Sequence, residues 1–423
     1  MQSNIPRRSL IQAFEAAVEA AQPGQAVAEH LPLRPVGRVV VVGAGKAACR
    51  MALTVEDIWQ ETASGVVITP YGHIGEDRPG RIRVLEARHP VPDQAGVEAT
   101  REVLRAVEGL TSDDLVLCLI SGGGSALLSL PCGISLEQKA ELTELLLKSG
   151  ATIGELNTVR KHVSGVKGGR LAAAAQPAQV VSLIVSDVVG DDLSVIASGP
   201  TVPDPSTYAD ALAVLDRYRI DVPSVRAHFD EGVRGGVDES PKPGATIFQR
   251  VENRLIVTAA QALEAAAGAL KAQGFDARIT NDRVEGESRL VALEHAEQTE
   301  RLLPGQASLT GGETTVIVRG KGRGGPNLEF LLALAVALRG EPDIYALAAD
   351  TDGIDGTGDA AGAILTPDAL ERAARRGLEP RAMLDNNDAY TFFLELGDLV
   401  KTGPTGTNVN DIRIVIRPRT TRG

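Results

Sequence analysis

The sequence predicts an α/β protein of two domains, the first a Rossmann-like parallel sheet and the second a smaller α/β unit. Apolar runs of strand length alternate with Ala-, Leu- and Glu-rich helical patterns along the chain, which is typical of parallel sheets covered by helices. The chain has 423 residues, more than one hydrophobic core usually serves. Many of its 45 glycines follow directly after predicted strands, the edge at which α/β sheets bind ligands.

The first domain is predicted over residues 1–237. Each of its expected strands is followed by a turn and a helical pattern, which indicates β-α-β units. These strands are expected at 38–42, 65–69, 82–87, 115–120 and 180–185. The periodicity ends at 233–244, where Gly, Pro and charged residues replace it, so we expect the domain boundary there.

The second domain is predicted over residues 245–423, where the alternation of strand and helix patterns resumes. Its strands are expected at 255–258, 277–280, 307–309, 314–318, 345–348 and 412–416, with helices at 261–271 and 328–338 among them.

Composition excludes several classes of function. Lys and Arg total 43 against 55 Asp and Glu, a net charge of -12, which is the reverse of the basic surface of a nucleic-acid binder. We therefore expect no nucleic-acid or acidic-membrane partner. The three cysteines form no CxxC pair, which suits a reducing compartment. With no secretory leader and no apolar run of about eighteen residues expected, a cytoplasmic protein is predicted, and homo-oligomer formation is left open.

The first glycine loop follows a strand of four valines and opens a helix as Gly43-Ala44-Gly45-Lys46. It matches the G-x-G-x-x-A dinucleotide fingerprint, but the next predicted strand runs into Pro70 without the acidic residue that binds the ribose of NAD. It is not a Walker A loop, because Ala47 stands where Ser or Thr would bind Mg²⁺. We expect Lys46 and Gly45 to bind an anion at the helix N-terminus; the alternative is an exposed lysine in a tight turn.

The second glycine loop repeats this arrangement after the strand at 115–120. It comprises Ser121, Gly122, Gly123, Gly124 and Ser125. Three consecutive glycines leave backbone N–H groups open to close approach, so we predict a phosphate-binding loop; a flexible turn is the alternative. A nucleophilic serine is disfavoured, because no G-x-S-x-G sequence is centred on either serine.

Four cationic side chains lie within residues 157–170 of an otherwise acidic protein, which favours an anionic small ligand. We take Asn157, Arg160 and Lys167 as ligand-binding candidates; at helical spacing Arg160 and Lys167 share one face, whereas Lys161 points elsewhere. His162 is expected to be a structural hydrogen-bonding group rather than a base.

Acidic residues and further glycine loops complete the candidate set. Asp187 ends a predicted strand, where a Mg²⁺ ligand or a general base is expected, and Asp350 and Asp352 form a D-x-D-G start that suits Mg²⁺. Arg323 lies among glycines and could clamp a phosphate bidentately. Other substrate- or phosphate-binding candidates are Glu313, Asn327, Thr405, Gly406, Thr407 and Asn408.

These strings, taken in order over nearly the whole chain, resemble the class II glycerate 2-kinase family, whose second domain is the MOFRL module. They are Gly43-Ala44-Gly45-Lys46-Ala47, His89-Pro90-Val91-Pro92-Asp93, Ser121-Gly122-Gly123-Gly124-Ser125, Asn157-Thr158-Val159-Arg160-Lys161-His162, Lys167-Gly168-Gly169-Arg170, Ser186-Asp187-Val188-Val189-Gly190-Asp191-Asp192, Ser198-Gly199-Pro200-Thr201, Gly311-Gly312-Glu313, Asp350-Thr351-Asp352-Gly353 and Pro404-Thr405-Gly406-Thr407-Asn408.

The resemblance implies transfer of the γ-phosphoryl group of ATP to the 2-hydroxyl of D-glycerate, with Mg²⁺, in a cleft between the two domains. It places the family's pivotal lysine at Lys46 and its mobile-domain arginine at Arg323. Pro326 departs from the family, many members of which have Arg there. Two alternatives remain at this point: an NAD(P)H-dependent hydroxypyruvate reductase and a non-catalytic nucleotide-binding regulator.

Overall fold

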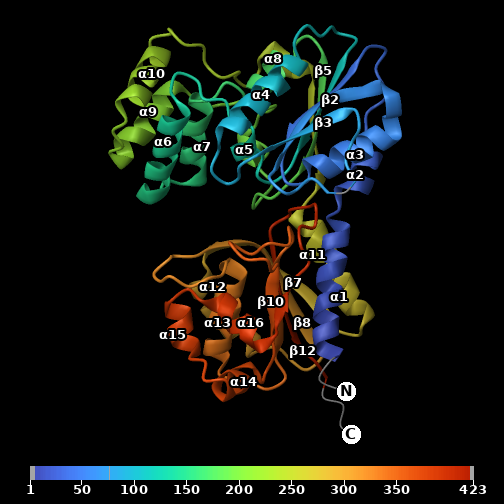
Figure 1. The fold of residues 1–423 in the computed structure, drawn as a ribbon, viewed down its shortest axis with the longest axis vertical. Helices are drawn as coiled ribbons and strands as arrows, with labels where there is room; N and C mark the ends of the chain where they lie inside the picture. Colours follow the sequence, from blue (N-terminus) through green and yellow to red (C-terminus); the bar gives the residue numbers. More distant parts are fainter. Residues whose placement is uncertain (1–4, 76, 420–423) are drawn as a thin grey trace. The chain divides into compact units, whose positions relative to one another are not determined.

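The computed structural model describes residues 5–75 and 77–419, which form two compact units. The N-terminal unit comprises Pro23–Ser186 and Asp191–Ile256. Among the described residues, the C-terminal unit comprises 5–22, Asp187–Gly190 and 257–419. Each unit has a six-stranded sheet with helices packed on it, so the predicted α/β class is confirmed (Figure 1).

The N-terminal unit is built on a sheet of order β3-β2-β1-β4-β5-β6. Its strands are β1 (Val39–Ala44), β2 (Ala63–Pro70), β3 (Ile82–Ala87), β4 (Leu115–Ile120), β5 (Gln179–Val185) and β6 (Val251–Val257). The pairs β3/β2, β2/β1, β1/β4 and β4/β5 are parallel, as the strand and helix alternation predicts. Because β1 and β4 are neighbours, the two glycine loops that follow them lie side by side.

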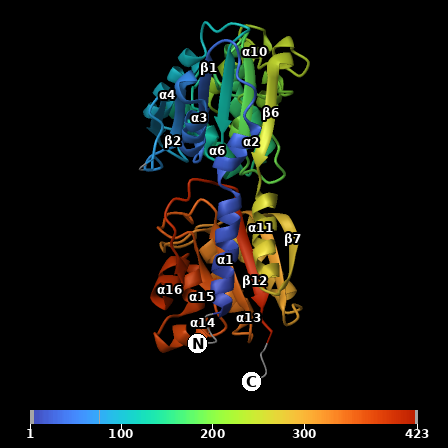
Figure 2. The same cartoon turned by 90° about the vertical axis from the view of Figure 1, so that its right-hand side faces the viewer.

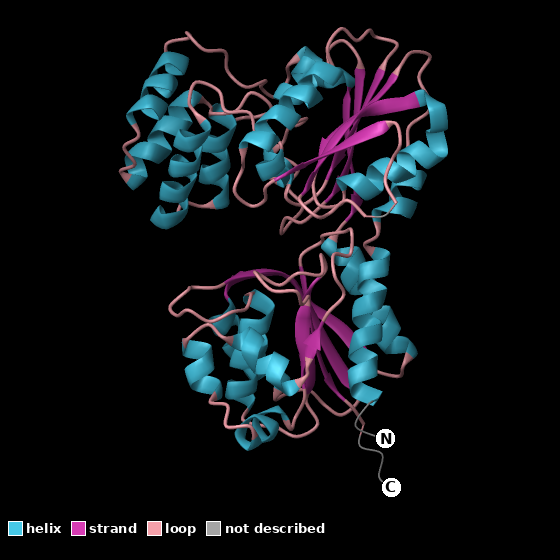
Figure 3. Ribbon diagram, in the orientation of Figure 1, coloured by secondary structure: helices cyan, strands magenta, loops and turns pink. Residues whose placement is uncertain are grey.

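Helices cover both sides of this sheet (Figure 3), and some form a separate helical cluster. The helices are α2 (Pro23–His30), α3 (Ala48–Trp59), α4 (Gln94–Ala106), α5 (Gly124–Leu127), α6 (Leu136–Ser149), α7 (Ile153–His162), α8 (Arg170–Ala174), α9 (Tyr208–Tyr218) and α10 (Pro223–Val233), with 3₁₀ turns η2 (Gln60–Thr62), η3 (Ile196–Ser198) and η4 (Thr246–Arg250). Helices α6, α7, α9 and α10 share a core that includes Leu146, Val159, Tyr208 and Phe229.

Local sequence fixes where several of these helices begin. Ser135 caps α6, Thr152 caps α7 and Thr207 caps α9, each accepting a hydrogen bond from the backbone three residues on. In each case the side chain at that third position hydrogen-bonds back to the cap residue, which satisfies two backbone N–H groups that no helical carbonyl reaches.

The C-terminal unit has a mixed sheet of order β11-β10-β9-β12-β8-β7. Its strands are β7 (Asp276–Glu287), β8 (Gln306–Thr315), β9 (Tyr345–Asp350), β10 (Gly362–Leu365), β11 (Leu399–Val400) and β12 (Asp411–Arg417). In this sheet β7 and β8 pair in parallel, whereas the pairs β8/β12, β12/β9, β9/β10 and β10/β11 are antiparallel. The predicted strand at 307–309 lies within β8, whereas only the first two residues of the strand predicted at 314–318 belong to β8 and residues 316–318 lie outside any strand.

The helices of this unit are α1 (Ile5–Ala20), α11 (Ala259–Ala272), α12 (Ser288–Thr299), α13 (Pro326–Leu338), α14 (Ala369–Arg375), α15 (Pro380–Asp385) and α16 (Ala389–Leu396). Figure 2 shows α1 lying beside α11, although they are far apart in the sequence. On the other side, α13 is buried almost all round, with Phe330 and Leu334 fully removed from water. Burying such side chains is worth about 1.5–3 kcal/mol each.

This division differs from the predicted domains 1–237 and 245–423. The residues up to Gln22, which include α1, group with the C-terminal unit, and the predicted strand at 255–258 is the end of β6 in the N-terminal sheet. The reason is that the Gly- and Pro-rich stretch at 233–244 is a loop inside the N-terminal unit rather than a linker, because the chain returns to the sheet after it.

No helix in the described ranges has the length and apolar character needed to cross a membrane.

Candidate functional site

The two glycine loops of the N-terminal unit interlock through backbone contacts. The backbone N–H of Lys46 donates to the carbonyl of Gly122 (2.8 Å), and that of Ala47 donates to Oγ of Ser121 (3.0 Å). Gly45 has φ of 145°, and a Cβ there would lie 2.0 Å from Oγ of Ser121. Glycine is therefore required for this close approach. Lys46 leaves the joined loops half-buried.

The hydroxyl of Ser121 thus holds the two loops together. Its side chain is fully buried, so we assign it to loop geometry, whereas the sequence suggested phosphate contact. Gly123 has φ of 82°, which favours glycine, and it directly precedes the single turn α5.

A chain of hydrogen bonds links Ser125 to distant parts of the N-terminal unit. Its hydroxyl lies 2.8 Å from that of Ser198, which in turn donates to Oδ1 of Asn157 (2.9 Å). Ala197 and Ser198 both have positive φ, 51° and 60°, a conformation that is costly for residues other than glycine. The buried Nδ2 of Asn157 has no hydrogen-bond partner among the described residues. Ser198 thereby links Ser125 and Asn157, two of the predicted ligand-binding residues.

Beside this chain lies a cavity of about 260 Å³ with three cationic side chains in its wall. Its lining comprises His89, Pro90, Pro92, Gly123, Ser125, Ala126, Lys139, Thr143, Arg160 and Lys167. None of these is a carboxylate, so the wall carries positive charge in a protein of net charge -12. Such a wall attracts an anion.

Two of the three cations are buried, and Arg160 is half-buried. Lys139 on α6 is 5% exposed and donates to Oγ of Ser129 (2.9 Å), whereas Lys167 is 1% exposed and donates to the carbonyl of Ser125 (2.7 Å). Burial lowers the pKa of Lys139 to about 8 and that of Arg160 to about 10, and it lowers the pKa of Lys167 well below its usual value. The attraction of a bound anion would offset the free-energy cost of removing these charges from water.

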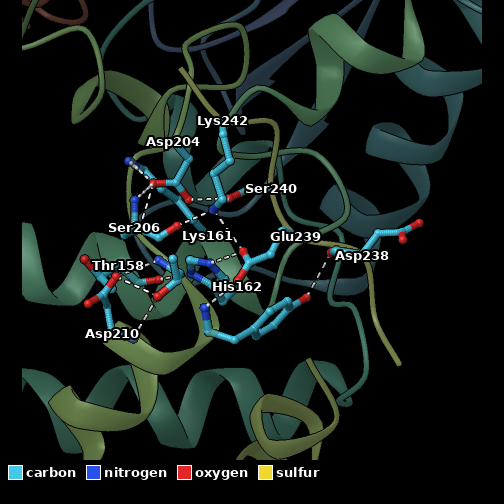
Figure 4. Close-up of polar contacts among 12 residues, drawn as sticks. Thr158, Lys161, His162, Asp204, Ser206, Asp210, Asp238, Glu239, Ser240 and Lys242 are labelled. Atoms are coloured by element: carbon cyan, nitrogen blue, oxygen red, sulfur yellow. Dashed lines mark hydrogen bonds and ion pairs between the residues drawn. The ribbon is translucent and has the colours of Figure 1, made fainter. Parts of the chain in front are cut away.

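The other face of α7 is fixed by a polar cluster, which Figure 4 shows. Lys161 lies 3.4 Å from the fully buried Asp204, which also accepts a hydrogen bond from Ser240. His162 contacts Glu239 through Nε2 (3.2 Å), and burial lowers the pKa of His162. The expectation that Lys161 points away from Arg160 therefore fits the structure, and His162 is hydrogen-bonded on both ring nitrogens. Helix α7 ends at His162, so Lys167 reaches the cavity from a loop and not from a helical face.

In the C-terminal unit, Arg323 is exposed on the loop before α13 and stacks on an aromatic ring. Its Cζ lies 4.4 Å from the centroid of the Tyr390 ring, and its backbone N–H donates to Oδ1 of Asp388 (3.1 Å). The backbone N–H of Tyr390 donates to the carbonyl of Arg323 (2.9 Å), and its hydroxyl donates to Asp359 (2.6 Å). These contacts fix the loop and hold the guanidinium over the Tyr390 ring of α16.

Asn327 is fully buried, although the sequence suggested contact with substrate. Its Nδ2 donates to Oδ1 of Asp411 (2.6 Å) and to Oδ1 of Asp355 (3.2 Å). Asp355 also accepts the backbone N–H groups of Asn327 and Leu328, so it caps α13. Burial raises the pKa of Asp355 to about 7. Pro326 is the first residue of α13, a position that needs no N–H, which explains its place here.

The loop at Thr405-Gly406-Thr407-Asn408 folds onto its own unit. The hydroxyl of Thr405 donates to the carbonyl of Thr351 (2.6 Å), and that of Thr407 donates to the carbonyl of Ala21 (2.6 Å). Gly406 has φ of 79°, and Asn408 accepts from the backbone of Asn410 (3.2 Å). The hydroxyls of Thr405 and Thr407 therefore both hydrogen-bond within the protein. The loop also contacts Asp352, because the backbone N–H of Thr405 donates to the carbonyl of Asp352 (3.0 Å).

The remaining acidic candidates lie in the same unit. Asp350 ends β9, and its Oδ1 accepts the backbone N–H of Asp352 (2.9 Å). Glu313 is exposed on β8, opposite Glu285 of β7. Asp187 lies two residues after the end of β5 but belongs to the segment that groups with the C-terminal unit. Within the described ranges, no three His, Cys, Asp or Glu side chains gather in a metal-binding arrangement.

Profiles of two protein families match this chain. The one described as a domain of unknown function, DUF4147, matches residues 9–230, and the MOFRL family matches residues 306–411. D-glycerate 2-kinase of Thermotoga maritima is 42% identical over 96% of this chain and 97% of its own length. A solved structure of glycerate kinase from that organism superposes with a TM-score of 0.85, covering 97% of this chain and 99% of that chain at 42% identity.

The chain belongs to the MOFRL-domain glycerate kinase family. Human glycerate kinase, another member, is 37% identical over 96% of this chain and 92% of its own length. A protein of Agrobacterium vitis that is 50% identical, over 97% of this chain and 94% of its own, is named a hydroxypyruvate reductase. The resemblance read from the sequence motifs is therefore confirmed.

For a glycerate kinase, sequence reasoning missed three residues that the structure brings to the candidate sites. Lys139 on α6 lines the cavity from outside the glycine loops, Ser198 joins Ser125 to Asn157, and Tyr390 stacks on Arg323. Only Ser198 had a signal, the Ser198-Gly199-Pro200-Thr201 string, which carried no assigned role.

Proposed function

We propose that the chain is an ATP-dependent glycerate 2-kinase in which the cationic cavity of the N-terminal unit binds D-glycerate. Glycerate kinase activity follows from the family relation, which spans nearly the whole of this chain and of its relatives. That near full-length relation is the observation that carries the proposal. The reaction moves the γ-phosphoryl group of ATP to the 2-hydroxyl and gives 2-phosphoglycerate and ADP.

The size and charge of the cavity support glycerate as its occupant. At about 260 Å³ it is below the range of about 300–1,000 Å³ typical of sites for larger ligands, so it suits a three-carbon hydroxy acid better than a nucleotide. Arg160 and Lys139 would bind the carboxylate, and Lys167 and Ser125 lie on the same wall to position the hydroxyl groups.

Phosphoryl transfer needs positioning and charge neutralisation more than covalent catalysis. Lys46 leaves the joined glycine loops half-buried, and Arg323 leaves its loop exposed, so each can reach an anionic group of a bound substrate. In this proposal both neutralise negative charge on the transferred phosphoryl group. Asp187 either accepts the proton of the substrate hydroxyl or binds the metal.

The donor chemistry of one loop fits Mg²⁺. Asp350 at the end of β9 and Asp352 just after it are two carboxylates, and Mg²⁺ usually takes one or two carboxylates and keeps several waters. These two residues would hold the ion, which supplies charge neutralisation at the phosphates of ATP when bound.

A coupled assay tests the proposed reaction against the reductase named for the Agrobacterium relative. The kinase converts ATP and D-glycerate to a product that enolase consumes directly, because enolase acts on 2-phosphoglycerate. Oxidation of NADH by hydroxypyruvate, without phosphoglycerate formation, would establish the reductase instead. Binding of ATP with neither turnover would indicate a regulator, and a product that needs phosphoglycerate mutase before enolase would refute the 2-position.

A further inference from the structure

A second cavity, of about 300 Å³, lies within the C-terminal unit between α12 and the strands β7, β8 and β12. The proposed kinase reaction does not use it. Arg413, His295 and Thr310 are buried in its wall, and Arg278 and Arg301 are exposed at its rim.

Strand register places polar groups of three strands on one face of the sheet. Arg413 on β12 lies opposite Thr310 on β8, and Ser308 on β8 lies opposite Arg278 on β7. Directly opposed residues point to the same face, as do residues two apart on one strand. The hydroxyls of Ser308 and Thr280 lie 3.0 Å apart. This face of the sheet is therefore a polar floor beneath α12.

Arg413 carries unmet hydrogen-bonding capacity into this floor. It is 1% exposed, and only its Nη2 donates, to Oδ2 of Asp411 and to Oγ1 of Thr314, both at 2.8 Å. Nε and Nη1 are buried and find no partner among the residues that the structure describes. Leaving buried N–H groups of a charged side chain unpaired is costly, so a partner for them is expected.

The charges that line the cavity favour an anion. His295 donates from Nδ1 to the carbonyl of Val291 (2.8 Å), and its Nε2 then accepts from Thr310 (3.1 Å). Burial lowers the pKa of His295, so its ring is neutral near pH 7. The lining then contains three arginines and one carboxylate, Asp276, which is paired with Arg278 (2.8 Å), while Arg413 is paired with Asp411 outside the lining (2.8 Å).

We propose that this cavity binds a small oxyanion, the carboxylate or phosphate group of a metabolite of few carbon atoms. Arg413 donates to the anion from the groups that lack a partner, Ser308 donates its hydroxyl, and Arg301 adds charge at the rim. The residues of this site differ from those of the glycerate cavity, so this proposal does not depend on the proposed function.

Isothermal titration with inorganic phosphate, and in a second arm with acetate, tests the site. Ser308→Phe fills the cavity from its floor, and Ser112→Phe, at an exposed serine of the N-terminal unit, is the matched control. Arg160→Ala removes a cation of the other cavity and shows which binding heat belongs there. We expect Arg160→Ala and Ser112→Phe to keep binding of at least one probe, and Ser308→Phe to weaken it by about tenfold or more.

The arm that gives heat identifies phosphate or carboxylate as the preferred group. If melting curves show that Ser308→Phe is unfolded, Arg301→Ala decides in its place, with an expected weakening of about threefold or more, because the rim charge is solvent-screened. Two results would overturn the proposal. The first is that neither probe binds the Arg160→Ala variant at about 10 mM. The second is that the deciding variant, which is Ser308→Phe if it folds and Arg301→Ala if it does not, binds the probe as tightly as the wild type.

Discussion

The charge on Lys139 should make glycerate use depend on pH in the range just above neutrality. Burial lowers the pKa of this lysine to about 8, whereas Arg160 in the same wall, with a pKa of about 10, stays charged. Raising the pH therefore removes one positive charge from the cavity. The carboxylate of glycerate does not titrate in this range, so the protein supplies the change.

The size of the effect follows from the protonated fraction. With a pKa of about 8, Lys139 is about nine-tenths protonated at about pH 7 and about one-tenth protonated at about pH 9. If only the charged form binds the carboxylate well, the apparent affinity scales with that fraction. We expect kcat/KM for D-glycerate to fall about tenfold over this range. The same shift has an opposite consequence for folding: since the folded protein binds fewer protons here than the unfolded chain, stability rises with pH above about 8.

The assay is kcat/KM for D-glycerate at saturating ATP and Mg²⁺, coupled to enolase and run across this pH range. Lys139→Arg keeps the charge and should give a flat profile, whereas Lys139→Met should be flat and about tenfold lower at the neutral end. Lys148→Met is the matched control, because Lys148 lies on the same helix but is exposed and paired with Glu144. A wild-type profile without the fall, or the same fall in Lys139→Arg, would refute the assignment of this pKa to the cavity.

Three further predictions concern other parts of the molecule. Lys46→Ala and Arg323→Ala should each lower kcat by about two to three orders of magnitude with little change in melting temperature, and the double variant should be scarcely slower than the worse single one. Tyr390→Leu should lower kcat about two- to fivefold through loss of the stacked guanidinium, whereas Tyr390→Phe keeps the ring and the rate. Asp204→Ala leaves Lys161 buried and unpaired, so urea unfolding should show a loss of about 3–5 kcal/mol.

Sequence periodicity predicted most of the strands because each is a local pattern of apolar residues. The limits of β3 and β4 agree with the predicted ranges residue for residue. Strands β10 and β11 were not predicted, since they have four and two residues and carry too short a pattern. Assignment of β6 to its sheet depends on pairing with β5, from which about sixty residues of chain separate it, and no local pattern encodes such a pairing.

The candidate site could be predicted where it depends on backbone geometry. The glycine loops after β1 and β4 lie together because these strands are parallel neighbours, so their carboxyl ends lie at the same edge of the sheet. Gly45 accordingly packs against Ser121. Burial could not be read in the same way. Asn327 follows a glycine loop like a ligand-binding residue, yet it is fully buried and bonded to Asp355 and Asp411, which come from distant segments.

Two adjacent cations of α7, Arg160 and Lys161, differ in whether the protein itself supplies a carboxylate partner. Lys161 is neutralised within the protein by Asp204, a carboxylate brought from a separate loop. Arg160, the preceding residue, faces a different side of α7, where the cavity wall supplies Lys139 and Lys167 but no carboxylate. Placing three cations together in low dielectric is costly unless an anion joins them. The same helix therefore carries a completed ion pair on one face and an uncompensated positive wall on the other, and only the second requires a substrate.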